Sequence, residues 1–163
     1  MSERVPEGWE KKELSFLTDL VSEKTEFNNQ FEALTSSRSG LFRQSEYFNK
    51  RVTSADNTGY RIIAPGQFTF RAMSDDGTFK FNRSTYSFKG IVSPAYEVFE
   101  AKNCSPDFLD YVLNSDEFHQ QIYANAQGGT RLALKYSSLS KLKVQFPPLP
   151  EQKKIASILT SVD

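Results

Sequence analysis

The C-terminal stretch, residues 128–163, constrains the fold of this chain more than any other segment. It contains a Gly-Gly-Thr-Arg loop, a polar segment, an expected short strand over residues 143–146, and then Pro147, Pro148 and Pro150. Proline interrupts strands and helix interiors but fits the first turn of a helix, where the carboxylate of Glu151 also complements the helix dipole. The pattern predicts a strand that stops at the prolines and a helix over residues 149–163.

The expected helix is amphipathic. Its apolar residues recur at i, i+3, i+4 and i+7 and form one stripe, made of Ile155, Ile158, Leu159 and Val162. A helix of barely three turns is marginal by itself in water. The stripe therefore requires a partner, which is the globular body, a second helix or another chain.

Composition favours one packed domain. A chain of 163 residues with 38% hydrophobic and 13% aromatic residues is large enough to bury roughly 70% of its unfolded surface. The sequence has no apolar run of about 18 residues and no signal-peptide pattern at its start, so we expect no membrane partner. The single cysteine, Cys104, excludes an internal disulfide and a multi-cysteine metal site, which fits a reducing cytoplasm.

The order of expected elements indicates an α+β fold. Strands are expected at residues 9–14, 33–35, 60–63, 67–72, 79–82, 86–92, 95–100 and 143–146, with residues 22–32 and 41–60 irregular. The Asp75-Asp76-Gly77 sequence is typical of a hairpin turn. Two helices are expected to start at Ser105-Pro106 and Ser115-Asp116. We predict a single domain over residues 1–148, with a mixed, mostly antiparallel sheet and a helical pair, followed by the start of a long coiled-coil type helix.

Charge is distributed in blocks, although Lys+Arg and Asp+Glu balance at 20 each. Residues 1–35 carry 4 basic and 8 acidic side chains, and residues 36–90 carry 9 and 4. Residues 91–128 carry 1 and 6, and residues 129–163 carry 6 and 2. This segregation allows one basic face on a neutral protein. The alternative is that the blocks interleave in space and cancel.

The sequence offers little for catalysis. His119 is the single histidine and lies within an expected helix, without a second ligand one turn later. Cys104 precedes a helix start, but a buried small side chain is the simpler interpretation. Asp75 and Asp76 are explained by their turn. No phosphate-binding loop or dinucleotide fingerprint is present, so we expect no catalytic residue and no metal site.

The basic block has the chemistry of a DNA-binding surface. It holds 10 of the 22 aromatic residues together with many Asn, Gln and Ser residues. Arginine can bind guanine edges bidentately, amides can do the same for adenine, and lysine binds phosphates. The candidate DNA contacts are Arg38, Arg43, Lys50, Arg71, Lys80, Asn82, Arg83 and, from the later loop, Arg131. The alternative is that these are ordinary solvated strand faces and that Arg131 packs on a helix end.

Several segments resemble one known family. The tail PPLPEQKKIASILTSVD, the segment VPEGWEKKEL at residues 5–14, GIVSPAYEVF at residues 90–99 and GGTRLALKYSSLSKLKVQFPPLP at residues 128–150 are similar to the DNA-specificity subunit of type I restriction–modification enzymes. The resemblance covers nearly all of one target recognition domain and the first turns of its conserved helix. Leu149-Pro150-Glu151-Gln152 and Ile155-Ala156 match the junction with that helix. In the SPAY segment we expect Tyr96 to lie in the core.

The resemblance implies a non-catalytic subunit that recognises half of a split site in double-stranded DNA. Its helix would act as a spacer and as a docking surface for methyltransferase subunits, with a restriction and motor subunit joining the complex. S-adenosylmethionine, ATP and magnesium would belong to those partners, so no cofactor is expected here. The family subunit carries two recognition domains, so this chain is expected to be a fragment or a half-size subunit that pairs with a second half or with itself. The alternative function is a protein-interaction adaptor acting through the Ile155/Ile158/Leu159/Val162 stripe.

Overall fold

A computed structural model describes residues 5–47, 56–125 and 132–162 of the chain. The strands are β1 (Glu10–Glu13), β2 (Thr18–Val21), β3 (Glu32–Ser37), β4 (Gly40–Arg43), β5 (Arg61–Ile63), β6 (Phe68–Arg71), β7 (Met73–Ser74), β8 (Asn82–Arg83), β9 (Gly90–Val92), β10 (Tyr96–Ala101), β11 (Leu132–Ala133) and β12 (Lys143–Phe146). The helices are the 3₁₀ turn η1 (Leu14–Phe16), α1 (Gln44–Tyr47), α2 (Pro106–Leu113), α3 (Asp116–Asn125), α4 (Tyr136–Leu139) and α5 (Leu149–Val162).

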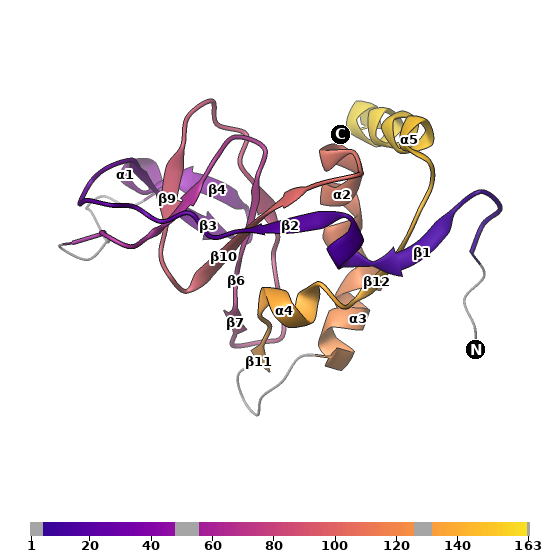
Figure 1. Ribbon diagram of the computed structural model, residues 1–163, viewed down its shortest axis with the longest axis horizontal. Coiled ribbons are helices and arrows are strands. Elements are labelled where there is room, and N and C mark those ends of the chain that lie inside the picture. The colour runs from indigo at the N-terminus through magenta and orange to yellow at the C-terminus, as the bar shows by residue number, and fades with distance from the viewer. Residues whose placement is uncertain (1–4, 48–55, 126–131, 163) are drawn as a thin grey trace.

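The strands form small sheets that are mostly antiparallel. One sheet has the order β2-β10-β6-β8, a second has the order β4-β3-β9-β5, and the pairs β1-β12 and β11-β7 are two-stranded. Only β3 and β9 pair in parallel among the described strands. The second sheet lies at one end of the molecule, and α2, α3 and α5 lie toward the other (Figure 1). The predicted α+β fold with a mixed, mostly antiparallel sheet is confirmed.

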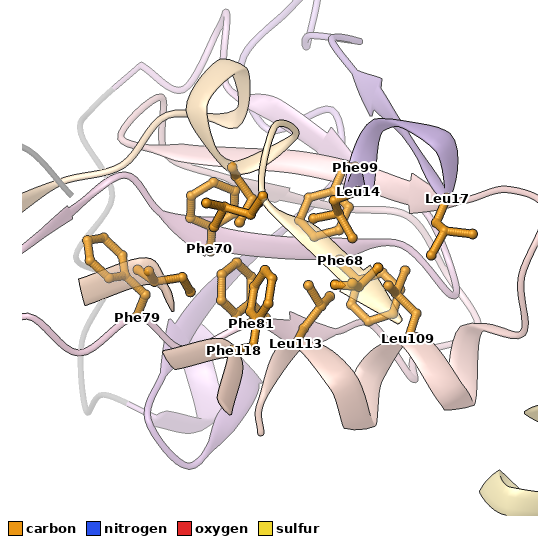
Figure 2. Close-up of a cluster of buried hydrophobic side chains, with 14 of the residues drawn as sticks. Leu14, Leu17, Phe68, Phe70, Phe79, Phe81, Phe99, Leu109, Leu113 and Phe118 are labelled. Carbon is orange, nitrogen blue, oxygen red and sulfur yellow. The ribbon is translucent and has the colours of Figure 1, made fainter. Parts of the chain in front are cut away.

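Phenylalanines dominate the larger core. Phe68 on β6 stacks on Phe99 of β10 with ring centroids 5.4 Å apart, and Phe70 meets Phe81 at 5.1 Å. Leu109 and Leu113 of α2 point from below into these rings (Figure 2). Because aromatic pairs bury large areas in defined geometries, they fix the two helices against the β6–β10 pair.

The strand alternation predicted around this core is wrong in two places. Alternation along residues 67–72 predicts Gln67, Thr69 and Arg71 on the outer face, opposite Phe68 and Phe70. Thr69 is instead fully buried, and its hydroxyl donates to the Glu97 carbonyl at 2.8 Å. Phe79 and Phe81 were expected on a return strand, whereas that strand begins only at Asn82. Thr69 is buried because β3 of the second sheet contacts β6, while Phe68 and Phe70 pack in the larger core.

A smaller core lies under the second sheet. It consists of Leu34, Ile63, Val92 and Val98, with Tyr96 packed against it. Gly90 pairs with Glu32 in the parallel β3–β9 ladder. A Cβ atom at Gly90 would lie 2.3 Å from Leu34 Cδ1. Glycine is therefore required here for the close approach of Leu34 to the strand backbone.

The helix starts follow the sequence signals. Ser105 caps α2, with its Oγ accepting the backbone N–H of Phe108 at 3.4 Å, and Pro106 occupies the first turn. Ser115 Oγ accepts the N–H of Phe118 at 3.3 Å at the start of α3. The two predicted helices are confirmed.

The stripe predicted on α5 is divided between two surroundings. Ile155 packs against the larger core, and Leu159 is half-buried. Ile158 remains 55% exposed. The side chain of Val162 lies outside the described part of the chain. The N-terminal part of α5 lies next to α2 (Figure 1). Its inward-facing residues are Gln152, Ile155 and Ala156. Ile155 is thus used within the domain, because the helix packs on its own body.

Candidate nucleic-acid interface

Three of the predicted DNA contacts meet at one concave surface. Arg38, Arg71 and Lys80 line a hollow of about 260 Å³, which we call the basic hollow. They come from the β3–β4 turn, from the end of β6 and from the segment after β7. Asp75 and Asp76 also line it, which leaves a formal charge of +1 from three cations and two anions. The fold therefore brings cations from separate parts of the basic block together.

The β3–β4 turn that carries Arg38 is fixed by Asn82. The Asn82 side chain is 5% exposed, and its Nδ2 donates to Ser36 Oγ and to the Ser37 carbonyl, both at 2.7 Å. Asn82 was predicted to contact DNA. Its burial and its two bonds to the turn argue against direct base contact. If the amide moved to a base, Ser36 Oγ and the Ser37 carbonyl would lose their hydrogen-bond donor. Asn82 acts instead as a support for the turn.

Asp76 is the partner of Arg38. Arg38 Nη2 donates to Asp76 Oδ2. Asp76 Oδ1 accepts the backbone N–H of Thr78 at 2.9 Å and the hydroxyl of Ser74 at 3.0 Å. The backbone N–H of Thr78, then Arg38 and Ser74, lower the pKa of Asp76 to about 2. The chain bends at Asp75-Asp76-Gly77, but the predicted hairpin with a return strand from residue 79 does not form, because β7 before the bend pairs with β11 and β8 pairs with β6. The sequence also showed no carboxylate partner for Arg38.

Tyr96 forms another part of the wall. It lies opposite Arg71 in the β10–β6 register, and its hydroxyl donates to the Ser36 carbonyl at 3.2 Å. Burial raises the pKa of the Tyr96 phenol, while the positive charge of Arg71 lowers it in part. Tyr96 was predicted to lie in the core. It is half-buried, with its ring against the smaller core and its hydroxyl at the hollow.

Arg43 and Arg83 lie outside the lining of the basic hollow. The Arg43 guanidinium lies 4.9 Å from the ring centroid of Phe88 and 5.9 Å from that of Tyr86. Such stacking holds a guanidinium in a fixed plane. Arg83 Nη1 donates to Asp107 Oδ1 at 2.5 Å, and its side chain is 23% exposed. Lys50 and Arg131 lie outside the described residues.

Cys104 and His119, which were weighed as catalytic candidates, lie in different surroundings. Cys104 is half-buried, burial raises the pKa of its thiol to about 11, and its Sγ donates to the Leu17 carbonyl at 3.5 Å. His119 lines a second, more open hollow of about 600 Å³ together with Tyr123, and Asp76 and Thr78 line both hollows. Within the described ranges no group of three or more His, Cys, Asp or Glu side chains could hold a metal ion.

Two members of the site were not predicted from the sequence, Asp76 as the partner of Arg38 and Tyr96 as a wall residue. Arg38 and Asp76 are 38 residues apart in the sequence, and no local pattern indicates that two side chains so far apart form a pair. Tyr96 follows the Ser-Pro bend, which was a signal for a special position but not for its exposure.

Arg38, Arg71 and Lys80 on one concave surface have the side-chain chemistry that contacts with nucleic acids use. The chain belongs to the family of type I restriction modification DNA specificity domains, whose model matches residues 6–163. It is therefore a target recognition domain of a type I specificity (S) subunit. No curated protein sequence matches the chain.

Solved structures share this fold. The HsdS subunit from Thermoanaerobacter tengcongensis is similar over 99% of this chain, with a TM-score of 0.63 and 15% identity. A structure of a type I R-M system gives 0.65 at 15% identity, and the type I S subunit from M. genitalium gives 0.56 at 17%, each over 99% of this chain. The chain spans 38%, 40% and 40% of the length of these proteins. Within its described residues, no helix is long and apolar enough to span a bilayer.

Proposed function

We propose that this domain reads a short half-site of duplex DNA through the basic hollow and performs no chemistry itself. The observation that carries the proposal is the convergence of Arg38, Arg71 and Lys80 on one concave surface. Arg38 and Arg71 have the planar donor forks that suit base edges in the major groove. Lys80, as a compact cation, suits a phosphate and sets register.

The remaining predicted contacts take peripheral roles in this proposal. Arg43 is held on Phe88 and Tyr86, and its Nη1 lies 3.6 Å from Glu46 Oε1, so in this proposal only its other donors meet a phosphate. Arg83 is paired with Asp107, so in this proposal it adds to the positive electrostatic potential and does not contact the DNA directly. Lys50 and Arg131 remain candidates on their chemistry alone.

We further propose that α5 links the domain to the rest of a restriction–modification complex. Ile158 on this helix is 55% exposed, so part of its apolar side chain faces solvent. The proposed partners are methyltransferase subunits, a restriction and motor subunit reached through the complex, and a second recognition half or a second copy. S-adenosylmethionine, ATP and magnesium would be bound by those partners.

The test is selection of randomised duplex DNA by the 163-residue chain, at about 50 mM and about 200 mM salt. The variants are Arg38→Ala and Arg71→Ala, and the matched control is Lys141→Ala, an exposed cation between α4 and β12. We expect one short motif to be enriched by the chain and by the control. Each arginine variant should relax one position of that motif, at a cost of about 1–3 kcal/mol.

The alternative function, an adaptor that acts through its helix, makes a different prediction. Apolar helix pairing depends weakly on salt, whereas phosphate contacts release counterions and weaken steeply as salt rises. Absence of DNA binding even at the lower salt concentration would overturn the proposed function and favour the adaptor, whose exposed Ile158 is its supporting observation.

A further inference from the structure

Asp76 is one of two carboxylates that line the basic hollow beside its three cations. Asp76 bonds Arg38, whose side chain is 73% exposed at the basic hollow. A DNA phosphate that approached Arg38 would also approach this negative charge. The negative charge of Asp76 therefore opposes the binding of a phosphate at Arg38. Arg38 is better explained by a contact with a neutral group.

The Asp76 carboxylate is also bound by residues of its own turn. Its Oδ1 is bound to the Thr78 N–H at 2.9 Å and to the Ser74 hydroxyl at 3.0 Å, so the turn fixes it independently of Arg38. Gly77 adopts a φ of +84° in this turn, a conformation that other residues rarely take. The position of Asp76 is consequently set by the fold and can in turn orient Arg38.

The bond to Asp76 uses one nitrogen of the Arg38 guanidinium, and the other N–H donors remain for a base. Only Nη2 of the guanidinium donates to Asp76 Oδ2. A guanidinium has five N–H donors in a rigid fork. The donors that do not face Asp76 can bind two acceptors at once, which is the arrangement that O6 and N7 of guanine present in the major groove.

We propose that Asp76 is a positioning residue that aims Arg38 at a guanine and selects against binding through phosphates alone. This inference rests on the proposed function and assigns one base of the half-site. Thr78, Ser74 and Arg38 already donate to the two oxygens of Asp76, so its role in this proposal is to hold Arg38 rather than to read a base. A guanine edge carries no net charge, so Asp76 opposes it far less than it opposes a phosphate.

The proposal predicts opposite effects of one substitution on two DNAs. Asp76→Asn keeps an oxygen for Thr78 and Ser74 but removes the charge that holds Arg38. Binding to the selected motif should weaken by about fivefold or more, because the fork is no longer oriented. Binding to an unrelated duplex should strengthen by about twofold to threefold, because a negative charge leaves the hollow.

Two matched variants separate orientation from charge. Asp75→Asn removes an equal charge from the same hollow and should strengthen binding to both duplexes. Arg38→Lys keeps the positive charge without the fork, so it should retain binding to the unrelated duplex and lose the preference for guanine. Thermal unfolding of all three variants serves to verify that they are folded.

The outcomes distinguish this inference from the function on which it rests. If the unsubstituted chain enriches no motif, the proposed function fails and the role of Asp76 fails with it. If a motif is enriched but Asp76→Asn behaves like Asp75→Asn on both duplexes, only the positioning role is overturned. The same conclusion follows if Asp76→Asn weakens both, or if the base that depends on Arg38 is not guanine.

Discussion

Gln152 at the start of α5 is bonded directly to the start of α2. Its side-chain Oε1 accepts the backbone N–H of Ser105 at 2.8 Å, and its Nε2 donates to the Pro147 carbonyl at 2.8 Å. The residue is 1% exposed. One buried amide thus fixes the exit direction of α5 relative to the recognition domain, because it satisfies two backbone groups that the fold has removed from water.

Gln152→Ala should destabilise the domain by about 2–3 kcal/mol, since it leaves a buried N–H and a buried carbonyl without partners. Urea unfolding followed by circular dichroism measures the loss. Lys153→Ala, at the neighbouring exposed position of the same helix, is the control and should lie within about 0.5 kcal/mol of the parent chain. A Gln152→Ala variant as stable as this control would show that α5 is not fixed through its glutamine.

Elements with local signals could be predicted from the sequence. The Ser105-Pro106 start, the turn before Gly77 and the proline stop before α5 depend on backbone preferences of the residues themselves. The strands β2 and β4 were missed. β2 pairs with β10, so that Val21 lies opposite Val98, and it is defined by a partner far away in the chain rather than by its own pattern.

The candidate site was predictable by residue type but not by environment. Arg38, Arg71 and Lys80 were chosen for their chemistry, and the structure brings them to one hollow. The same reasoning selected Asn82, which is buried, because an amide that supports a turn and an amide that reads a base look alike in a sequence. Pairing of Arg38 with Asp76 depends on how two turns meet, and no local pattern records it.

Gly90→Ala should destabilise the smaller core by about 1–3 kcal/mol, because the added methyl group would meet Leu34 Cδ1 at 2.3 Å. Leu34→Ala alone should also destabilise it, by about 2–5 kcal/mol. In the double variant the clash is absent, so the loss should be smaller than the sum of the single losses by about 0.5 kcal/mol or more. Denaturant unfolding of all four proteins completes the cycle, and simple additivity would contradict the packing argument.

Asp76 should titrate at about pH 2 in the folded chain, below its ordinary value of 3.8. Its ionised form therefore favours the folded state above about pH 3.8, and that contribution is lost as the pH falls toward 2. Carbon chemical shifts of the carboxyl group measure the midpoint. In Arg38→Ala the pKa should rise but stay below 3.8, because the Thr78 N–H remains bound. A midpoint unchanged by that substitution would show that Arg38 leaves Asp76 in solution.

Lys80→Ala tests whether the basic hollow also contacts the DNA backbone. Lys80 lines the hollow and is close enough to the half-buried Asp110 to lower its pKa in part, against the larger upward effect of burial. If its ammonium group binds a phosphate, the substitution should weaken binding to the motif and to unrelated duplexes by the same factor.

The salt dependence gives the sharper measurement, because one phosphate contact contributes a slope of about 0.9 in log K against log salt. Lys80→Ala should lower the slope by about that amount, and Lys141→Ala should leave it unchanged. A Lys80→Ala variant that changes one position of the motif would instead make this lysine a base reader. An unchanged slope and an unchanged affinity would mean that Lys80 does not contact DNA and that its charge acts on Asp110 alone.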